Sequence, residues 1–135
     1  MENESDFDIA SARAQWYKRE SLRRIEAEKQ RNIALGKVME AVQAVLPHYP
    51  SIQRAYLFGS IIRPGAFYHY SDIDIAVDHA SPDDYWATWR DLERQLPGWT
   101  VDFRVMADDP VFASMVENAG SLVYERETAA TESQS

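Results

Sequence analysis

The sequence predicts a small α/β or α+β domain in which one mixed sheet of about four strands is covered by helices. Short segments in which apolar and polar residues alternate are bounded by Gly, Pro, Ser or Asp, which is typical of strands. Longer segments between them repeat apolar residues at helical spacing. The 135 residues suffice for one hydrophobic core, and they contain neither an internal repeat nor a linker between two cores.

The first predicted helix covers residues 8–31, where strong helix formers dominate and charges of both signs interleave. Its apolar stripe is thin, with Trp16, Leu22 and Ile25 as the main large side chains. Two interpretations stay open. This segment is either a projecting helix that docks on a partner or on a second copy of the chain, or a solvated extension.

A second helix, the first of the core, is predicted over residues 32–46. Apolar residues recur there at helical spacing, namely Ile33, Leu35, Val38, Met39, Val42, Val45 and Leu46. Pro47 and Pro50 forbid its continuation. Two more helices are expected, one between Ser81 and Pro97 and one over residues 110–118.

The predicted strands cover residues 52–58, 73–77, 100–106 and, as a last short strand, 121–124. We therefore divide the chain into an N-terminal helical extension (residues 1–31), one domain (32–126) and a polar tail (127–135) that lacks periodicity and is expected to be disordered.

Charge and composition narrow the possible functions. The net charge is −8, and residues 47–135 hold six Lys and Arg against fourteen Asp and Glu. Nucleic-acid binding normally requires a basic surface, so direct binding of a polynucleotide is disfavoured, whereas a nucleotide that carries its own cation is not. Without cysteine, the ligands for a metal are carboxylates, three histidines and backbone oxygens, a set that suits Mg²⁺. No apolar run could cross a bilayer and the N-terminus is acidic, so we expect a cytoplasmic protein without membrane contact.

Three aspartates fall in predicted strands. Side chains alternate along a strand, so Asp72 and Asp74 share one face while the residues between and after them point into the core. Two neighbouring carboxylates repel each other and need a compensating positive charge. Asp102 lies in the next strand, where a third carboxylate would complete a magnesium site. The alternative is that Asp102 is an edge-strand charge paired with Arg104.

A Gly-Ser pair, Gly59-Ser60, follows the first predicted strand directly. Glycine lets the backbone come close to a phosphate, and serine offers both its amide and its hydroxyl as donors. Such a pair alone is only a turn, but here Asp72 follows after eleven intervening residues.

Together these residues resemble the polymerase-β-like nucleotidyltransferases, and among them the minimal nucleotidyltransferases (MNT) that act as antitoxins beside helical HEPN toxins. The family pattern is Gly-Ser, about ten residues, Asp-x-Asp and a later Asp. It is matched by Gly59, Ser60, Asp72, Asp74 and Asp102, together with Leu57-Phe58, Ser71 and residues 122–126. The resemblance covers roughly residues 33–126.

The resemblance implies a magnesium-dependent transfer of AMP from ATP to a hydroxyl acceptor, which in the antitoxin branch is a tyrosine of the partner HEPN toxin. In that case Mg²⁺ and the catalytic step would depend on Asp72, Asp74 and Asp102. The nucleotide would be held by Gly59, Ser60, Arg63 and Ser71.

Three alternatives remain. The first is an inactive or catalytically weak antitoxin that neutralises its partner by covering it. The loop before Asp72, one residue longer than the common spacing, and the helical extension favour this interpretation. The second is transfer to a small molecule, for which the chain looks too short to hold the acceptor. The third is action on tRNA ends, which the acidic charge disfavours.

Overall fold

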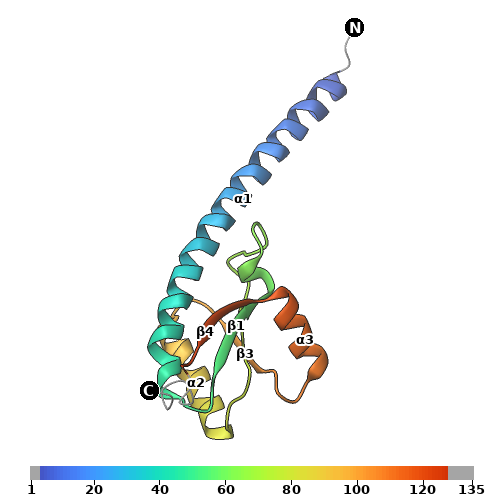
Figure 1. Cartoon of the computed structure of the whole chain (residues 1–135). Coiled ribbons are helices and arrows are strands. Elements are labelled where there is room, and N and C mark those ends of the chain that lie inside the picture. The colour runs from blue at the N-terminus through green and yellow to red at the C-terminus, as the bar shows by residue number, and fades with distance from the viewer. Residues whose placement is uncertain (1–3, 128–135) are drawn as a thin grey trace.

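A four-stranded mixed sheet forms the centre of the protein, as the sequence predicts. The computed structural model describes residues 4–127, with side chains from residue 8 onward. The strand order is β3-β2-β1-β4, so β3 (Val101–Val105) and β4 (Ser121–Glu125) are the edges. β1 (Arg54–Phe58) is antiparallel to β4 and to β2 (Ile73–Val77), whereas β2 and β3 run parallel (Figure 1).

Helices cover the sheet unequally. α1 (Glu4–Val45) and α2 (Pro82–Gln95) contribute to the larger core cluster, and the short α3 (Pro110–Ala119) contributes to a smaller one on the other face. The larger cluster includes Ile73, Ile75 and Phe103 from the central strands. Because strand side chains alternate between faces, Asp74 and Asp102 lie on the face that α3 covers only in part.

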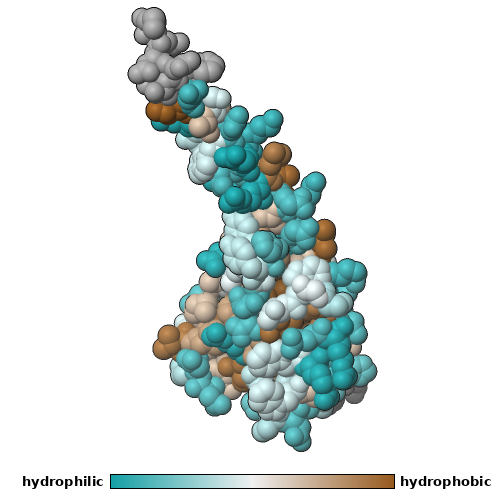
Figure 2. All heavy atoms as spheres, turned by 180° about the vertical axis from the view of Figure 1, so that it is seen from behind, coloured by the Kyte–Doolittle hydropathy of each residue, from teal (hydrophilic) through white to brown (hydrophobic). Residues whose placement is uncertain are grey.

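α1 is one continuous helix of 42 residues, so the predicted break between two helices near residue 31 is wrong. Neither a proline nor a capping turn interrupts the segment, and only the apolar pattern changes there. From residue 8 to residue 26 no side chain is buried, and this half projects away from the body (Figure 1). Figure 2 shows isolated apolar side chains among hydrophilic ones along this part. Trp16, Leu22 and Ile25 are all at least half exposed.

The docked half of α1 matches the predicted core in part. Val38, Val42, Val45 and Leu46 are buried, and Leu35 is partly buried. Ile33 and Met39, expected in the core, are 50% and 40% exposed. The buried stripe contains the predicted Val38 and, in place of these two residues, Ala34 and Ala41. These residues follow one another at spacings of four and three, so they share a face that Ile33 and Met39 do not.

Contacts from α2 fix the edge strand β3. The Tyr85 hydroxyl donates to the Phe103 carbonyl at 3.1 Å, and the Trp89 indole donates to the Val101 carbonyl at 2.9 Å. Both carbonyls lie along the unpaired edge, which would otherwise be open to another strand. Asp102 lies between these two anchored positions, so its backbone is well fixed.

The other predicted elements agree with the structure to within a few residues. α2 begins after Ser81, whose hydroxyl accepts from the Asp84 amide, and α3 begins after Asp109, whose carboxylate accepts from the Phe112 amide. The tail predicted to be disordered lies, apart from its first residue, outside the described residues. Although α1 is long, no helix within residues 4–127 is apolar over enough of its length to cross a membrane.

Candidate active site

Asp74 and Asp102 lie directly beside each other on neighbouring strands. The parallel register of β2 and β3 pairs these two positions, so both side chains leave the same face of the sheet. Both carboxylates are half-buried, whereas Asp72, one residue before β2, is exposed. The structure thus brings together the two predicted carboxylates that belong to strands, and leaves the third at the rim.

The environment of Asp74 is short of positive charge. Its pKa is raised from 3.8 to about 6, first by burial, then by the negative charge of Asp102 and next by that of Asp72. The nearby Arg104 guanidinium opposes this shift only in part. A cation at this position would relieve the repulsion among the carboxylates.

Arg104 is the charge that the protein itself supplies. Its side chain lies 3.3 Å from the Asp102 carboxylate and its guanidinium lies 5.5 Å from the centre of the Phe112 ring on α3. The alternative view of Asp102, a charge paired on an edge strand, therefore describes a real contact. The two side chains are 55% and 30% exposed, and such an ion pair contributes little stability. Arg104 lies two residues after Asp102 in the same strand, so the two side chains share a face. This spacing in the sequence could have predicted that Arg104 belongs to the site.

The turn Gly59–Ile62 (η2) lies against these carboxylates. Gly59 has a φ of +76°, a conformation that glycine adopts without strain. Phe58, just before it, is paired with Asp74 across β1 and β2, and a Cβ atom on Gly59 would collide with the Asp74 carboxylate. The close approach of turn and carboxylate therefore requires glycine at this position.

The other predicted nucleotide-binding residues follow this turn. The Arg63 amide donates to the Ser60 carbonyl at 3.1 Å, which closes the turn. The exposed Arg63 side chain lines a pocket of about 250 Å³ beside α3, together with Phe58, Gly59, Ile62, Met115 and Ala119. Ser71 has a local partner instead, because its hydroxyl accepts from the Tyr68 amide at 2.9 Å.

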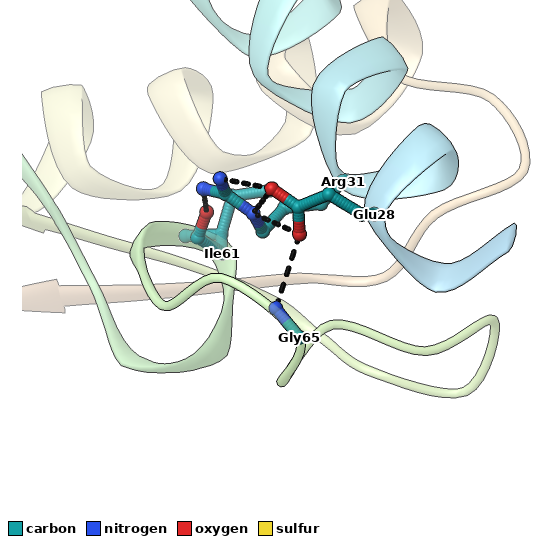
Figure 3. A network of polar contacts seen from close by, with 4 residues as sticks. All are labelled: Glu28, Arg31, Ile61 and Gly65. Atoms are coloured by element: carbon teal, nitrogen blue, oxygen red, sulfur yellow. Dashed lines mark hydrogen bonds and ion pairs between the residues drawn. The ribbon is translucent and has the colours of Figure 1, made fainter. Parts of the chain in front are cut away.

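A pair of charged residues on α1 contacts the same region, and sequence reasoning missed it. The Arg31 guanidinium donates to the Ile61 carbonyl at 3.1 Å, and Glu28 accepts from the Gly65 amide at 3.0 Å (Figure 3). Glu28 and Arg31 also bond to each other. The pKa of Glu28 is lowered to about 2, mainly by Arg31 and then by the Gly65 amide. No local pattern signals contacts between residues more than thirty positions apart.

The donor chemistry of the site fits a magnesium ion. Asp74 and Asp102 offer the hard carboxylate oxygens that Mg²⁺ prefers, and the raised pKa of Asp74 marks a place where a cation is favoured. Within residues 4–127, however, no three acidic or histidine side chains are gathered closely enough to hold a metal ion as they stand. Asp72 would have to turn toward the pair to add a third carboxylate, so the metal role of this trio stays a prediction.

Comparison with known families decides the wider assignment. Residues 40–129, two thirds of the chain, match the family model described as "Polymerase beta, Nucleotidyltransferase". The chain belongs to the polymerase beta nucleotidyltransferase family. This confirms the resemblance that the sequence motifs indicated, and the matched region contains the Gly59 turn and all three aspartates.

Solved structures of toxin–antitoxin complexes share this nucleotidyltransferase fold. A crystal structure of a toxin–antitoxin with AMP-PNP matches at 26% identity and a TM-score of 0.55, over 66% of this chain and 74% of that one. A mutant of the MntA-HpeT toxin–antitoxin matches at 24% identity and a TM-score of 0.51 over the same shares, which shows the fold alone. A tri-AMPylated Shewanella oneidensis HEPN toxin in complex with its MNT antitoxin matches at 24% identity over 73% of this chain and 76% of that one. Its TM-score is 0.49. A search of curated proteins found no match.

Proposed function

We propose that this nucleotidyltransferase transfers AMP from ATP to a hydroxyl group, in a reaction that depends on Mg²⁺, and that the acceptor is a tyrosine of a partner HEPN toxin. The observation that carries the proposal is the placement of Asp74 beside Asp102, with the Gly59 turn in contact, on a sheet face that α3 leaves partly open. The likeness to the toxin–antitoxin structure with AMP-PNP supports an adenine nucleotide and a toxin partner.

In this proposal Asp72, Asp74 and Asp102 hold Mg²⁺, which would offset negative charge on the triphosphate and on the reacting oxygens. The tight Gly59 turn lets backbone amides approach the phosphates, and Ser60 adds its hydroxyl as a donor. Arg63 and Arg104, both exposed at the edges of the site, are the cationic side chains available to the triphosphate.

The transfer itself is a displacement at the α-phosphorus of ATP. The acceptor oxygen forms a bond to this phosphorus while the bond to the bridging oxygen of the β-phosphate breaks, and pyrophosphate leaves. The acceptor's proton passes to a carboxylate, for which Asp102 is our candidate. The protein thus contributes mainly geometry and charge.

Transfer of label from α-labelled ATP tests the proposal. The protein would be incubated with Mg²⁺, ATP and an all-helical toxin encoded beside it. We expect labelled toxin with the wild type and none with Asp72→Ala combined with Asp74→Ala. The matched control is Asp108→Ala, which removes an exposed carboxylate from the segment between β3 and α3. Undiminished transfer by the double variant would refute the site.

A second candidate is an antitoxin that acts only by binding its partner. The separation of Asp72 from the other two carboxylates and the ion pair between Asp102 and Arg104 favour it. The two candidates differ in one measurement. A catalytic site binds ATP with affinity that rises on adding Mg²⁺, whereas a protein that only covers its partner shows no such dependence while still blocking toxin activity.

A further inference from the structure

The pair Glu28 and Arg31 connects the long helix to the turn that would hold the nucleotide. Arg31 is 12% exposed at its side chain and bonds to the Ile61 carbonyl, which belongs to the turn that contains Ser60. Glu28 bonds to the Gly65 amide, a few residues further along (Figure 3). α1 therefore holds this loop at two points.

These two points lie on either side of Arg63. Between them the chain is closed by two backbone hydrogen bonds of 3.1 Å, from the Arg63 amide to the Ser60 carbonyl and from the Ala66 amide to the Arg63 carbonyl. Gly65 has a φ of +78°, so the loop also bends there through a left-handed residue. The position of Arg63 along the edge of the site thus depends on contacts with α1.

We propose that Glu28 and Arg31 are positioning residues, which hold Ser60 and Arg63 in place for the triphosphate of the nucleotide. This inference rests on the proposed function of the same site. Neither residue would itself touch the phosphates. They act through the loop, by reducing the conformational freedom that nucleotide binding would otherwise have to remove.

A comparison within α1 separates this role from ordinary helix stabilisation. Glu20 and Arg23 form the same kind of pair at the same spacing, 3.2 Å apart, on the part of α1 that projects from the body. The Glu28–Arg31 pair adds contacts to distant residues. Glu28 bonds to Gly65, 37 positions away, and Arg31 bonds to Ile61, 30 positions away. It also lies before residue 40, where the match to the family model begins, so the pair is a feature of this chain outside the matched region.

The chemistry of the two side chains makes the contact specific. Arginine has a planar fork that can bond a carboxylate and a carbonyl at once, which the single ammonium of lysine cannot reproduce in the same geometry. Glu28 uses one oxygen for the Gly65 amide while bonding to Arg31. Removing either residue therefore releases one end of the loop. It also leaves the remaining residue of the pair without an oppositely charged partner.

The test compares Arg31→Met and Glu28→Ala with the control variants Arg23→Met and Glu20→Ala. Steady-state AMP transfer gives KM for MgATP and kcat separately, and hydrogen exchange reports the protection of the Gly65 amide in the full chain. Glu28→Gln serves as a conservative variant, because its carbonyl can still accept from that amide. Thermal melting verifies that each variant is folded.

We expect KM for MgATP to rise about tenfold in Arg31→Met and Glu28→Ala, with kcat lowered by less than about threefold, since the released loop must be ordered again on binding. Gly65 should lose protection in both variants. In Glu28→Gln the rise in KM should be smaller than in Glu28→Ala. In the control variants KM should stay within about twofold of the wild type.

The failures can be told apart. If the wild type neither transfers AMP nor binds MgATP, the proposed function fails and the inference falls with it. If the wild type is active but folded Arg31→Met and Glu28→Ala keep its KM, the inference alone is overturned. An equal rise in KM in the control variants overturns it as well, because the effect would then belong to the helix and not to the loop. Should Arg31→Met not fold, the Glu28 variants decide in the same way.

Discussion

The substitution Asp74→Asn should stabilise the metal-free protein at neutral and alkaline pH. Asp74 is held among like charges in a half-buried position, which raises its pKa from 3.8 to about 6. A shift of one pKa unit corresponds to about 1.4 kcal/mol, so the full shift would amount to about 3 kcal/mol. Asp74 is only partly shielded from solvent, and we reduce the expected gain in the free energy of unfolding to about 1–2 kcal/mol.

The sign follows from proton binding. Between pH 4 and 6 the folded state binds the Asp74 proton more tightly than the unfolded state, so the stability that this proton provides is complete below pH 3.8 and is lost as pH rises through about 6. The asparagine side chain of the variant carries no charge at any pH. The two proteins should therefore be equally stable near pH 4 and diverge toward pH 8, with the variant the more stable.

Urea denaturation at pH 4, 5, 6, 7 and 8 in the presence of EDTA measures this difference. Asp108→Asn, at an exposed position, is the control and should follow the wild type at every pH. Saturating Mg²⁺ at pH 8 should narrow the gap, because the ion would stabilise only the protein that keeps its carboxylate. A variant that is less stable than the wild type at pH 8, or a constant difference at all pH values, would refute the reasoning.

Three further outcomes are expected. Gly59→Ala should lower the free energy of unfolding by more than about 2 kcal/mol, because the φ is positive and a Cβ atom there collides with Asp74. Gly65→Ala is the control, since it meets only the backbone strain of about 1 kcal/mol. Urea denaturation compares the two variants. Deleting residues 1–24 should change the free energy of unfolding by less than about 0.5 kcal/mol, since this part buries no described side chain. Val38→Ala, in the docked half, should lower it by about 2 kcal/mol. A large loss of stability on truncation would contradict a projecting helix without contacts to the body. Chelating Mg²⁺ should reduce ATP affinity at least about tenfold by calorimetry, and ATP binding that is indifferent to EDTA would count against the metal site.

Local signals were sufficient to predict the strands and the short helices. Ile73–Val77 was predictable because apolar side chains alternate with Asp74 and the segment is bounded by polar residues. Ser81 and Asp109 carry the capping chemistry that starts α2 and α3. The spacing from Gly59-Ser60 to Asp72 added the family pattern, so most of the candidate site was predictable as well.

Features set by tertiary contacts were not predictable. The buried face of α1 uses Ala34 and Ala41, because the helix lies close to its neighbours, and hydropathy alone favours the larger Ile33 and Met39. The direct pairing of Asp74 with Asp102 depends on the strand register, which no local pattern fixes. The contacts of Glu28 and Arg31 with the loop join distant parts of the chain and leave no trace in the sequence around them.

Because α1 is one continuous helix, its projecting part holds residue 8 at a fixed distance from the body of the protein. A helix rises about 1.5 Å per residue, so the stretch from residue 8 to residue 26 extends about 28 Å beyond the last buried turn. Because the docked half holds one end of this rod, its direction relative to the sheet is set by the body. A protein bound near residue 8 would therefore contact this chain about 28 Å from the last buried turn of α1, at a position that the docked half fixes relative to the carboxylates.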